Sequence, residues 1–305
     1  MNNHHVYEKL INITSEQNVM VNEPLKNHTY TRLGGRADLL VTPETYEQVR
    51  EIVKLANEEG VPFTLLGNGS NLIVKDGGIR GIVMNLNKLN EIKTDGTKVI
   101  AQSGARIIDT SREALKQHLT GLEFACGIPG SVGGALYMNA GAYGGEVKDC
   151  LESAIVIDRN GDLLSLNADE LDLEYRRSNI PDKGYIVLEG TFALEEGNYE
   201  EIKAIMDDLT FKRESKQPLE YPSCGSVFKR PPGYFAGKLI QDSGLQGKQI
   251  GGAQVSLKHA GFIVNKDNAT ADEYIRLIRH VQSTVKDKFG VTLEREVRII
   301  GEDLE

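Results

Sequence analysis

The sequence has little that would support a disulfide-bonded or metal-binding protein. Its three cysteines, Cys126, Cys150 and Cys224, lie far apart and form no Cys-x-x-Cys spacing. An odd, dispersed set of this kind indicates buried thiols rather than a disulfide framework or a thiolate metal site. The six histidines include no His-x-x-x-His pair. We therefore expect no metal site.

Long apolar runs and excess positive charge are also missing. No apolar run approaches the length of a membrane span, and the N-terminus is polar, so we expect a cytoplasmic protein. The formal net charge is −9, which disfavours nucleic acid as a partner. An anionic ligand would need a local cationic patch. Lys212, Arg213 and Lys216, followed by Lys229, offer one.

The 305 residues suffice for two or three packed domains, and 40% of them are apolar. Thr42 and Pro43 predict the start of a helix that ends near Gly60, and a second helix is expected over residues 107–119, closed by Gly121. Asn160-Gly161 predicts a hairpin turn.

The C-terminal third carries its own signals. Thr270 and Glu273 form a capping-box pattern that opens a helix ending at Gly290. Residues 293–300 alternate like a strand, which would place Glu296 and Arg298 on the same side.

Residues 67–71, Gly-Asn-Gly-Ser-Asn, form the first glycine-rich loop. A dinucleotide fingerprint would need a third glycine where Leu72 stands and a helix where a strand is expected, so the Rossmann interpretation fails. Backbone N–H groups in such a loop can still bind phosphate. A plain surface turn would explain the loop equally well.

The second loop is more informative. Residues 127–145 contain seven glycines in nineteen positions and are apolar rather than serine-rich. This composition is untypical of a flexible linker and indicates a large flat ligand or a closely approaching backbone. A glycine-rich structural turn remains an alternative.

Three further segments hold candidate reactive residues. Residues 175–178 contain Arg176, residues 224–228 contain Ser226, and Glu296 lies on the predicted last strand. Taken singly, each has an ordinary interpretation: a charged surface turn, a turn serine and a solvated strand face.

Taken in order, these segments resemble the UDP-N-acetylenolpyruvoylglucosamine reductase (MurB) family over nearly the whole chain, from about residue 27 to 301. The resemblance rests on several separate motifs in the right order. They are residues 31–35 (TRLGG), 67–71 (GNGSN), 127–134 (GIPGSVGG), 139–144 (NAGAYG), 175–178 (YRRS), 225–229 (GSVFK) and 294–298 (EREVR).

The resemblance implies an α+β fold. An FAD-binding domain of the vanillyl-alcohol-oxidase (PCMH) type would form two α/β lobes, followed by a C-terminal α+β substrate-binding domain. We expect lobe 1 over residues 1–85, with residues 299–305 as a candidate segment that returns to it. Lobe 2 is expected over residues 86–205, and the substrate domain over residues 206–298. The chain leaves little room for the tyrosine-bearing loop of some members, so it resembles the shorter subfamily.

The implied reaction belongs to peptidoglycan precursor synthesis. NADPH reduces non-covalently bound FAD, and the enolpyruvyl double bond of UDP-N-acetylglucosamine enolpyruvate is then reduced to give UDP-N-acetylmuramate. Negative charge develops at the α-carbon and its carboxylate, where a cation and a donor stabilise it. By resemblance, Arg176 and Glu296 have this role, and Ser226 donates the proton.

The resemblance also implies binding residues. Those expected near FAD are Gly67, Asn68, Gly69, Ser70, Asn71, Gly127, Ile128, Pro129, Gly130, Ser131, Gly133, Gly134, Ala140, Gly141 and Val187. Those expected to bind the substrate are Tyr175, Arg213, Lys216 and Lys229. The expected partners are these small molecules alone, with the protein a monomer or weak oligomer.

Two other functions remain open. Another FAD-dependent oxidase or dehydrogenase of the same fold, acting on an alcohol or sugar, would explain both glycine loops. A non-catalytic nucleotide-sugar or flavin-binding regulator would need the loops but not Ser226.

Overall fold

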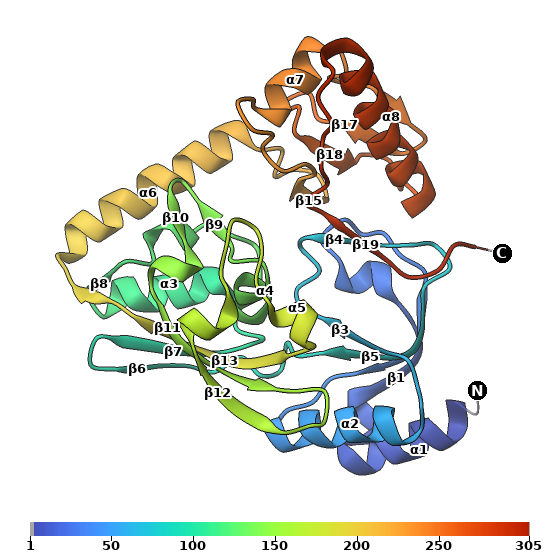
Figure 1. Ribbon diagram of the computed structural model, residues 1–305, viewed down its shortest axis with the longest axis vertical. Coiled ribbons are helices and arrows are strands. Elements are labelled where there is room, and N and C mark those ends of the chain that lie inside the picture. Colours follow the sequence, from blue (N-terminus) through green and yellow to red (C-terminus); the bar gives the residue numbers. More distant parts are fainter. Residues whose placement is uncertain (1–2, 305) are drawn as a thin grey trace. The chain divides into compact units, whose positions relative to one another are not determined.

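The computed structural model describes residues 3–304, which form two compact units. The first contains the residues up to 22 together with 38–68 and 80–212. The second contains residues 23–37, 69–79 and those from 213 onward. Segments that are distant in the sequence therefore build each unit, as the colours along the ribbon show (Figure 1). None of the helices within residues 3–304 is long and apolar enough to cross a membrane.

The first sheet combines four strands with two helices. The strand order is β1 (Val19–Pro24), β2 (Arg36–Val41), β5 (Ile79–Asn85) and β3 (Phe63–Leu66), and the helices are α1 (Asn3–Ile13) and α2 (Tyr46–Glu58). Helix α2 buries Val49, Ile52 and Ala56, an apolar stripe at helical spacing. It begins later than Thr42 predicts, because the Thr45 side chain caps it by accepting from the Gln48 N–H at 3.2 Å.

A second, five-stranded antiparallel sheet lies in the same unit. Its order is β12 (Leu163–Asn167), β11 (Leu151–Ile157), β13 (Ile186–Ala193), β7 (Lys98–Gln102) and β6 (Ile92–Asp95). The predicted turn at Asn160-Gly161 joins β11 to β12, with Gly161 at φ +86°. Helix α4 (Val132–Tyr137) packs on β13 and fixes the second glycine loop to this sheet.

The first unit also contains shorter elements. They are α3 (Ile107–Lys116), β8 (Leu119–Thr120), the hairpin of β9 (Gly141–Ala142) and β10 (Gly145–Glu146), α5 (Ile180–Lys183) and β14 (Glu195–Glu196). The long helix α6 (Tyr199–Lys216) belongs to the first unit as far as Lys212, and its last residues belong to the second. The predicted end of α3 at residue 119 is wrong. His118 adopts φ +59°, and Leu119 pairs with Glu196 of β14 instead.

The second unit packs two helices with an antiparallel sheet. The sheet order is β15 (Ser223–Ser226), β18 (Phe262–Asn265), β17 (Ala253–Val255) and β16 (Gln249–Ile250). The helices are α7 (Ala236–Asp242) and α8 (Ala271–Phe289). A separate pair is formed by β4 (Leu72–Val74) and β19 (Arg298–Ile300), which run parallel. Helix α8 lies against β17 and β18 (Figure 1). Its Tyr274 is fully buried.

Both ends of α8 follow the sequence prediction. Thr270 and Glu273 form the reciprocal capping box, and Gly290 ends the helix at φ +69°. The Asp76 carboxylate adds a second cap, accepting from the N–H groups of Ala271 and Asp272 at 2.9 Å each. Local signals were sufficient here because both the cap and the stop lie within a few residues of the helix.

The predicted strand over residues 293–300 is shorter than expected. Leu293 and Val297 are buried, but only the last three residues form β19. The N–H groups of Glu296 and Val297 both point at the carbonyl of Val227, at 2.9 and 3.4 Å. Two donors on one acceptor interrupt the regular ladder, so Glu296 lies on an irregular segment beside β15.

Candidate active site

The first glycine loop begins where β3 ends. The Gly67 carbonyl accepts from the Asn85 side-chain amide at 3.3 Å, and a β-carbon at Gly67 would lie 3.0 Å from Ser131 Oγ. Within the first unit, the structure thus brings the start of the first loop against the second. The absence of a side chain at Gly67 permits that approach.

The second loop is tied to the turn after β7. Ser131 caps α4 by accepting from the Gly134 N–H at 3.3 Å, and the Gly133 N–H donates to the Ser103 carbonyl at 2.9 Å. A β-carbon at Gly133 would lie 2.1 Å from Ser103 Oγ. Close packing against Ser103, without any ligand, therefore explains this glycine by itself.

The first loop retains donors that suit an anion. The backbone N–H groups of Asn68, Gly69 and Ser70 form no hydrogen bond with another group among residues 3–304. Gly69 has φ +63°, and a β-carbon there would collide with the His28 carbonyl at 2.3 Å. Consecutive N–H donors without side-chain obstruction fit a phosphate of a nucleotide cofactor.

Three further residues predicted near FAD are Ala140, Gly141 and Val187. Ala140 and Gly141 begin the β9–β10 hairpin, where a β-carbon at Gly141 would lie 2.6 Å from the Gly145 carbonyl. Val187 is 3% exposed and belongs to the hydrophobic core of the first unit. Its side chain is therefore already packed by protein.

Arg176 lies at the tip of a tight turn in the first unit. Glu174 and Arg177 exchange two backbone hydrogen bonds, at 3.0 and 3.1 Å, and Arg176 between them has φ +56°. Its Nη2 donates to the Gly141 carbonyl at 2.7 Å, and its guanidinium lies 5.2 Å from the ring centre of the exposed Tyr175. The turn therefore holds the guanidinium beside the second glycine loop.

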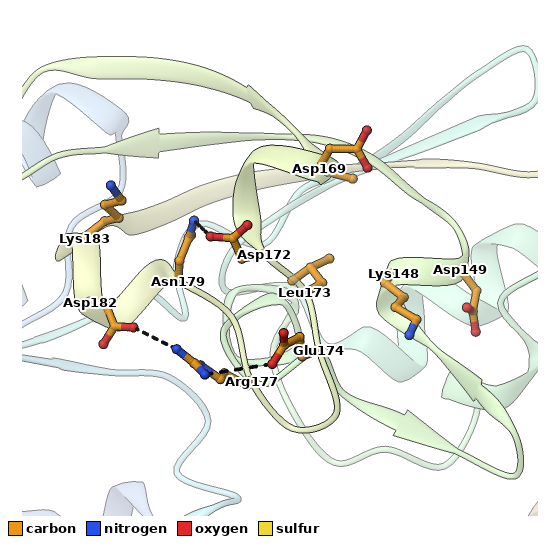
Figure 2. A pocket seen from close by; sticks show the side chains of 11 residues that line it. Lys148, Asp149, Asp169, Asp172, Leu173, Glu174, Arg177, Asn179, Asp182 and Lys183 are labelled. Atoms are coloured by element: carbon orange, nitrogen blue, oxygen red, sulfur yellow. Dashed lines mark hydrogen bonds and ion pairs between the residues drawn. The ribbon is translucent and has the colours of Figure 1, made fainter.

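Arg177, the next residue, points elsewhere. It lies between Glu174 and Asp182, at 3.9 and 3.7 Å, and lines a hollow of about 730 Å³ (Figure 2). Charged side chains of both signs surround this hollow, and none of the residues predicted to act in catalysis or binding lines it. The ordinary interpretation of a surface arginine in an ion pair thus fits Arg177.

Ser226 is presented by a bulge at the end of β15. A regular strand would place Cys224 and Ser226 on one face. The pairing with β18 shifts register between Ser223 and Ser226, and Gly225 has φ +77°. As a result, Cys224 is 3% exposed while Ser226 is exposed. Burial also raises the pKa of the Cys224 thiol to about 11.

The structure brings Glu296 next to this bulge. The Glu296 N–H donates to the carbonyl of Val227, the residue after Ser226, at 2.9 Å. Asn71 of the first glycine loop lies beside the same segment, since its side-chain amide donates to the Glu296 carbonyl at 3.4 Å. Ser226, Glu296 and Asn71 therefore gather in the second unit, whereas Arg176 belongs to the first.

The predicted cationic patch is divided between two elements. Arg213 and Lys216 lie in the last turn of α6, and Lys212 pairs with Asp208 at 2.5 Å. Lys229 follows the Ser226 bulge and pairs with Glu294 at 2.6 Å.

Sequence reasoning gave no role to Asn139, which is fully buried in the first unit. Its side chain donates to the Glu174 carbonyl and accepts from the Lys148 N–H, both at 2.9 Å. A lone asparagine in an apolar, glycine-rich stretch was the available signal, because a buried amide must find partners.

Fold and loops together define a flavin-binding oxidoreductase. A family model described as an FAD binding domain matches residues 37–167, and one for the UDP-N-acetylenolpyruvoylglucosamine reductase C-terminal domain matches residues 217–300. This match confirms the predicted FAD-binding α+β fold and its FAD cofactor.

Whole-chain comparisons are more specific. The reductase of Oceanobacillus iheyensis is 75% identical over 98% of both chains, and that of Geobacillus kaustophilus is 66% identical over 98% of both. The crystal structure of the Thermus caldophilus reductase (MurB) aligns with a TM-score of 0.79 at 36% identity, covering 92% of this chain and 97% of that one. The chain belongs to the UDP-N-acetylenolpyruvoylglucosamine reductase family, as the sequence motifs predicted.

Proposed function

We propose that this enzyme uses NADPH and FAD to reduce the enolpyruvyl double bond of UDP-N-acetylglucosamine enolpyruvate, giving UDP-N-acetylmuramate. The observation that carries the proposal is the bulge at Gly225, which exposes a hydroxyl at Ser226 beside Glu296. A chain that needed only to bind a nucleotide would have no use for a proton donor presented in this way. The family relationship supports the same substrate.

The cofactor residues are assigned by the fit of the loops. Asn68, Gly69 and Ser70 would hold a phosphate of FAD through their N–H groups, and residues 127–134 would line the cofactor beside them. When bound, FAD supplies the hydride for the β-carbon of the enolpyruvyl group. The protein's part is to exclude water and to stabilise the charge that remains on the substrate.

Three side chains then act on the substrate. Arg176 stabilises the negative charge that develops on the carboxylate, because a fixed guanidinium interacts more strongly with the transition state than with the ground state. Ser226 gives its hydroxyl proton to the α-carbon. A serine is a weak acid, but the acceptor is carbanion-like, so placement matters more than acidity. Glu296, which lies beside the Ser226 strand, is the acid that acts with Arg176 on the developing negative charge.

Substrate binding is assigned to the cations and to the turn of Arg176. Lys229, Arg213 and Lys216 would bind the diphosphate, arginine through a bidentate fork and lysine as a point charge. Tyr175 is 53% exposed beside Arg176 and would pack on the substrate. The location in the cytoplasm, and the oligomeric state as a monomer or weak oligomer, remain predictions.

Anaerobic half-reactions test the proposal. The purified protein should be yellow, NADPH should bleach it, and UDP-N-acetylglucosamine enolpyruvate should restore the colour without oxygen. A colourless protein that takes up no FAD would overturn it. Restoration by oxygen alone, with turnover of an alcohol or sugar, would favour an oxidase or dehydrogenase of the same fold.

A further inference from the structure

We propose that Asn139 is a positioning residue that holds the Arg176 turn in its reactive place. The inference rests on the role proposed above for Arg176. It rests on the buried side-chain amide of Asn139, which joins the turn to the second glycine loop. The Gly141 carbonyl of that loop accepts a hydrogen bond from the Arg176 guanidinium. All of these residues belong to the first unit.

The backbone at Asn139 has an ordinary structural task. Helix α4 ends in a Schellman motif: the Ala140 N–H donates to the Ala135 carbonyl at 2.8 Å, and the Asn139 N–H donates to the Leu136 carbonyl at 3.1 Å. Asn139 takes the left-handed position with φ +41°. Glycine serves equally well in that position, so ending the helix does not require an amide side chain.

The side chain has a separate task. Asn139 is 0% exposed, and its Nδ2 donates to the Glu174 carbonyl at 2.9 Å while its Oδ1 accepts from the Lys148 N–H at 2.9 Å. The first partner is 35 residues away and the second is 9. One amide thus ties the end of α4 to two other segments, and both of its polar atoms are satisfied.

Those two segments determine where Arg176 lies. Glu174 is the first residue of the tight turn, so its carbonyl anchors the backbone that carries Arg176. Asn139 and Lys148 bracket the β9–β10 hairpin, whose Gly141 carbonyl accepts from the Arg176 guanidinium. The same amide therefore fixes both the backbone of Arg176 and the acceptor of its side chain.

Position is important for a residue that stabilises developing charge. A displacement of about 1 Å at a reacting centre can cost about 100-fold in rate. Arg176 also has φ +56°, a conformation that a non-glycine residue keeps only when its surroundings impose it. Loss of the Asn139 side chain would let this turn relax away from the geometry that the reaction needs.

Asn139→Gly separates the two tasks, because it preserves the left-handed helix end and removes only the amide. We expect NADPH to reduce the bound flavin at an unchanged rate, while reoxidation by the enolpyruvyl substrate slows about 10- to 100-fold. Asn139→Asp keeps the acceptor for Lys148 but faces the Glu174 carbonyl with a carboxylate, and it should slow the same step. Asn268→Gly is the matched control, since Asn268 is an exposed asparagine with φ +47°, and it should change neither step.

A double-mutant cycle with Arg176→Ala shows whether Asn139 acts through Arg176. In the Arg176→Ala background, Asn139→Gly should cost little more in the second half-reaction, because the side chain it positions is gone. Additive losses would overturn the inference. So would loss of FAD, or an equal slowing of both half-reactions, in the two Asn139 variants. If Arg176→Ala alone leaves the second half-reaction unchanged, the proposed role of Arg176 is what fails.

Discussion

The Arg176 turn and the Ser226 bulge, which carry proposed catalytic side chains, differ in which residue adopts the left-handed backbone conformation. In the first unit, Arg176 itself has φ +56°, although it carries a large side chain. In the second unit, the left-handed residue is Gly225, with φ +77°, and Ser226 follows it. A glycine adopts such angles without steric cost, whereas an arginine does not.

The difference determines what each site requires from its surroundings. The Arg176 turn is held by contacts from other segments: the Asn139 amide to Glu174, the Ser178 hydroxyl to the Tyr137 carbonyl at 2.7 Å, and the Arg176 side chain to Gly141. At the Ser226 bulge the left-handed angle lies on Gly225, and the flanking backbone pairs with β18 and with Glu296. Arg176 should therefore depend on distant residues, and Ser226 on the local backbone.

The largest expected effect follows from removing the Ser226 hydroxyl. Ser226→Ala should leave flavin reduction by NADPH intact and slow reoxidation by the enolpyruvyl substrate by about 100-fold or more, as expected for loss of a positioned proton donor. Anaerobic stopped-flow absorbance measures both steps. Equal slowing of the two half-reactions would show that Ser226 is not the donor.

A smaller effect is expected at the adjacent glycine. Gly225→Ala forces a β-carbon into the left-handed region, at a cost of about 1–2 kcal/mol. Among residues 3–304, no atom beyond the chain neighbours lies within 4 Å of that β-carbon. Relaxation of the bulge would turn the Ser226 hydroxyl away from the substrate. We therefore expect reoxidation of the flavin to slow by about 10-fold.

Gly244→Ala is the matched control for that experiment. Gly244 has φ +74° and equally open surroundings, so this variant should lose a similar amount of stability in urea unfolding while keeping both rates. If Gly225→Ala lost stability without any change in the second half-reaction, the bulge would have no part in presenting Ser226.

The smallest effect on the reaction is expected at two buried thiols, Cys150 in the first unit and Cys224 in the second, which act on stability alone. Burial raises the pKa of Cys150 from 9.0 to about 12 and that of Cys224 from 9.0 to about 11. The folded state then holds protons that the unfolded state releases. The stability contributed by each thiol is complete below pH 9 and is lost as the pH rises through the folded pKa.

Urea unfolding at pH 8 and pH 10.5 should therefore show that the free energy of unfolding falls more steeply with pH in the wild type than in Cys150→Ala. The limit is about 1.4 kcal/mol per pH unit for each thiol. The corresponding Cys224→Ala comparison should show the same sign. Parallel pH dependence in the wild type and both variants would mean that the thiols titrate normally in the folded protein.

Local signals in the sequence predicted several elements correctly. The capping box at Thr270, the helix stop at Gly290 and the hairpin turn at Gly161 are all present. The predictions that failed concern boundaries that distant partners set. Helix α3 ends early because Leu119 pairs with β14, and the last strand is short because Val227 accepts from two N–H groups.

The sequence alone determined the family, the FAD-binding fold and the order of the motifs, because spacing and residue type are properties of the chain itself. Only the tertiary structure decided which side chains are presented and what holds them. Alternation would have placed Ser226 with the buried Cys224, and the bulge at Gly225 separates them. Asn139 acquires its task only when folding brings Glu174 and Lys148 within 2.9 Å of one amide. Hydrogen-bond partners of buried groups are set by packing, which local spacing does not encode.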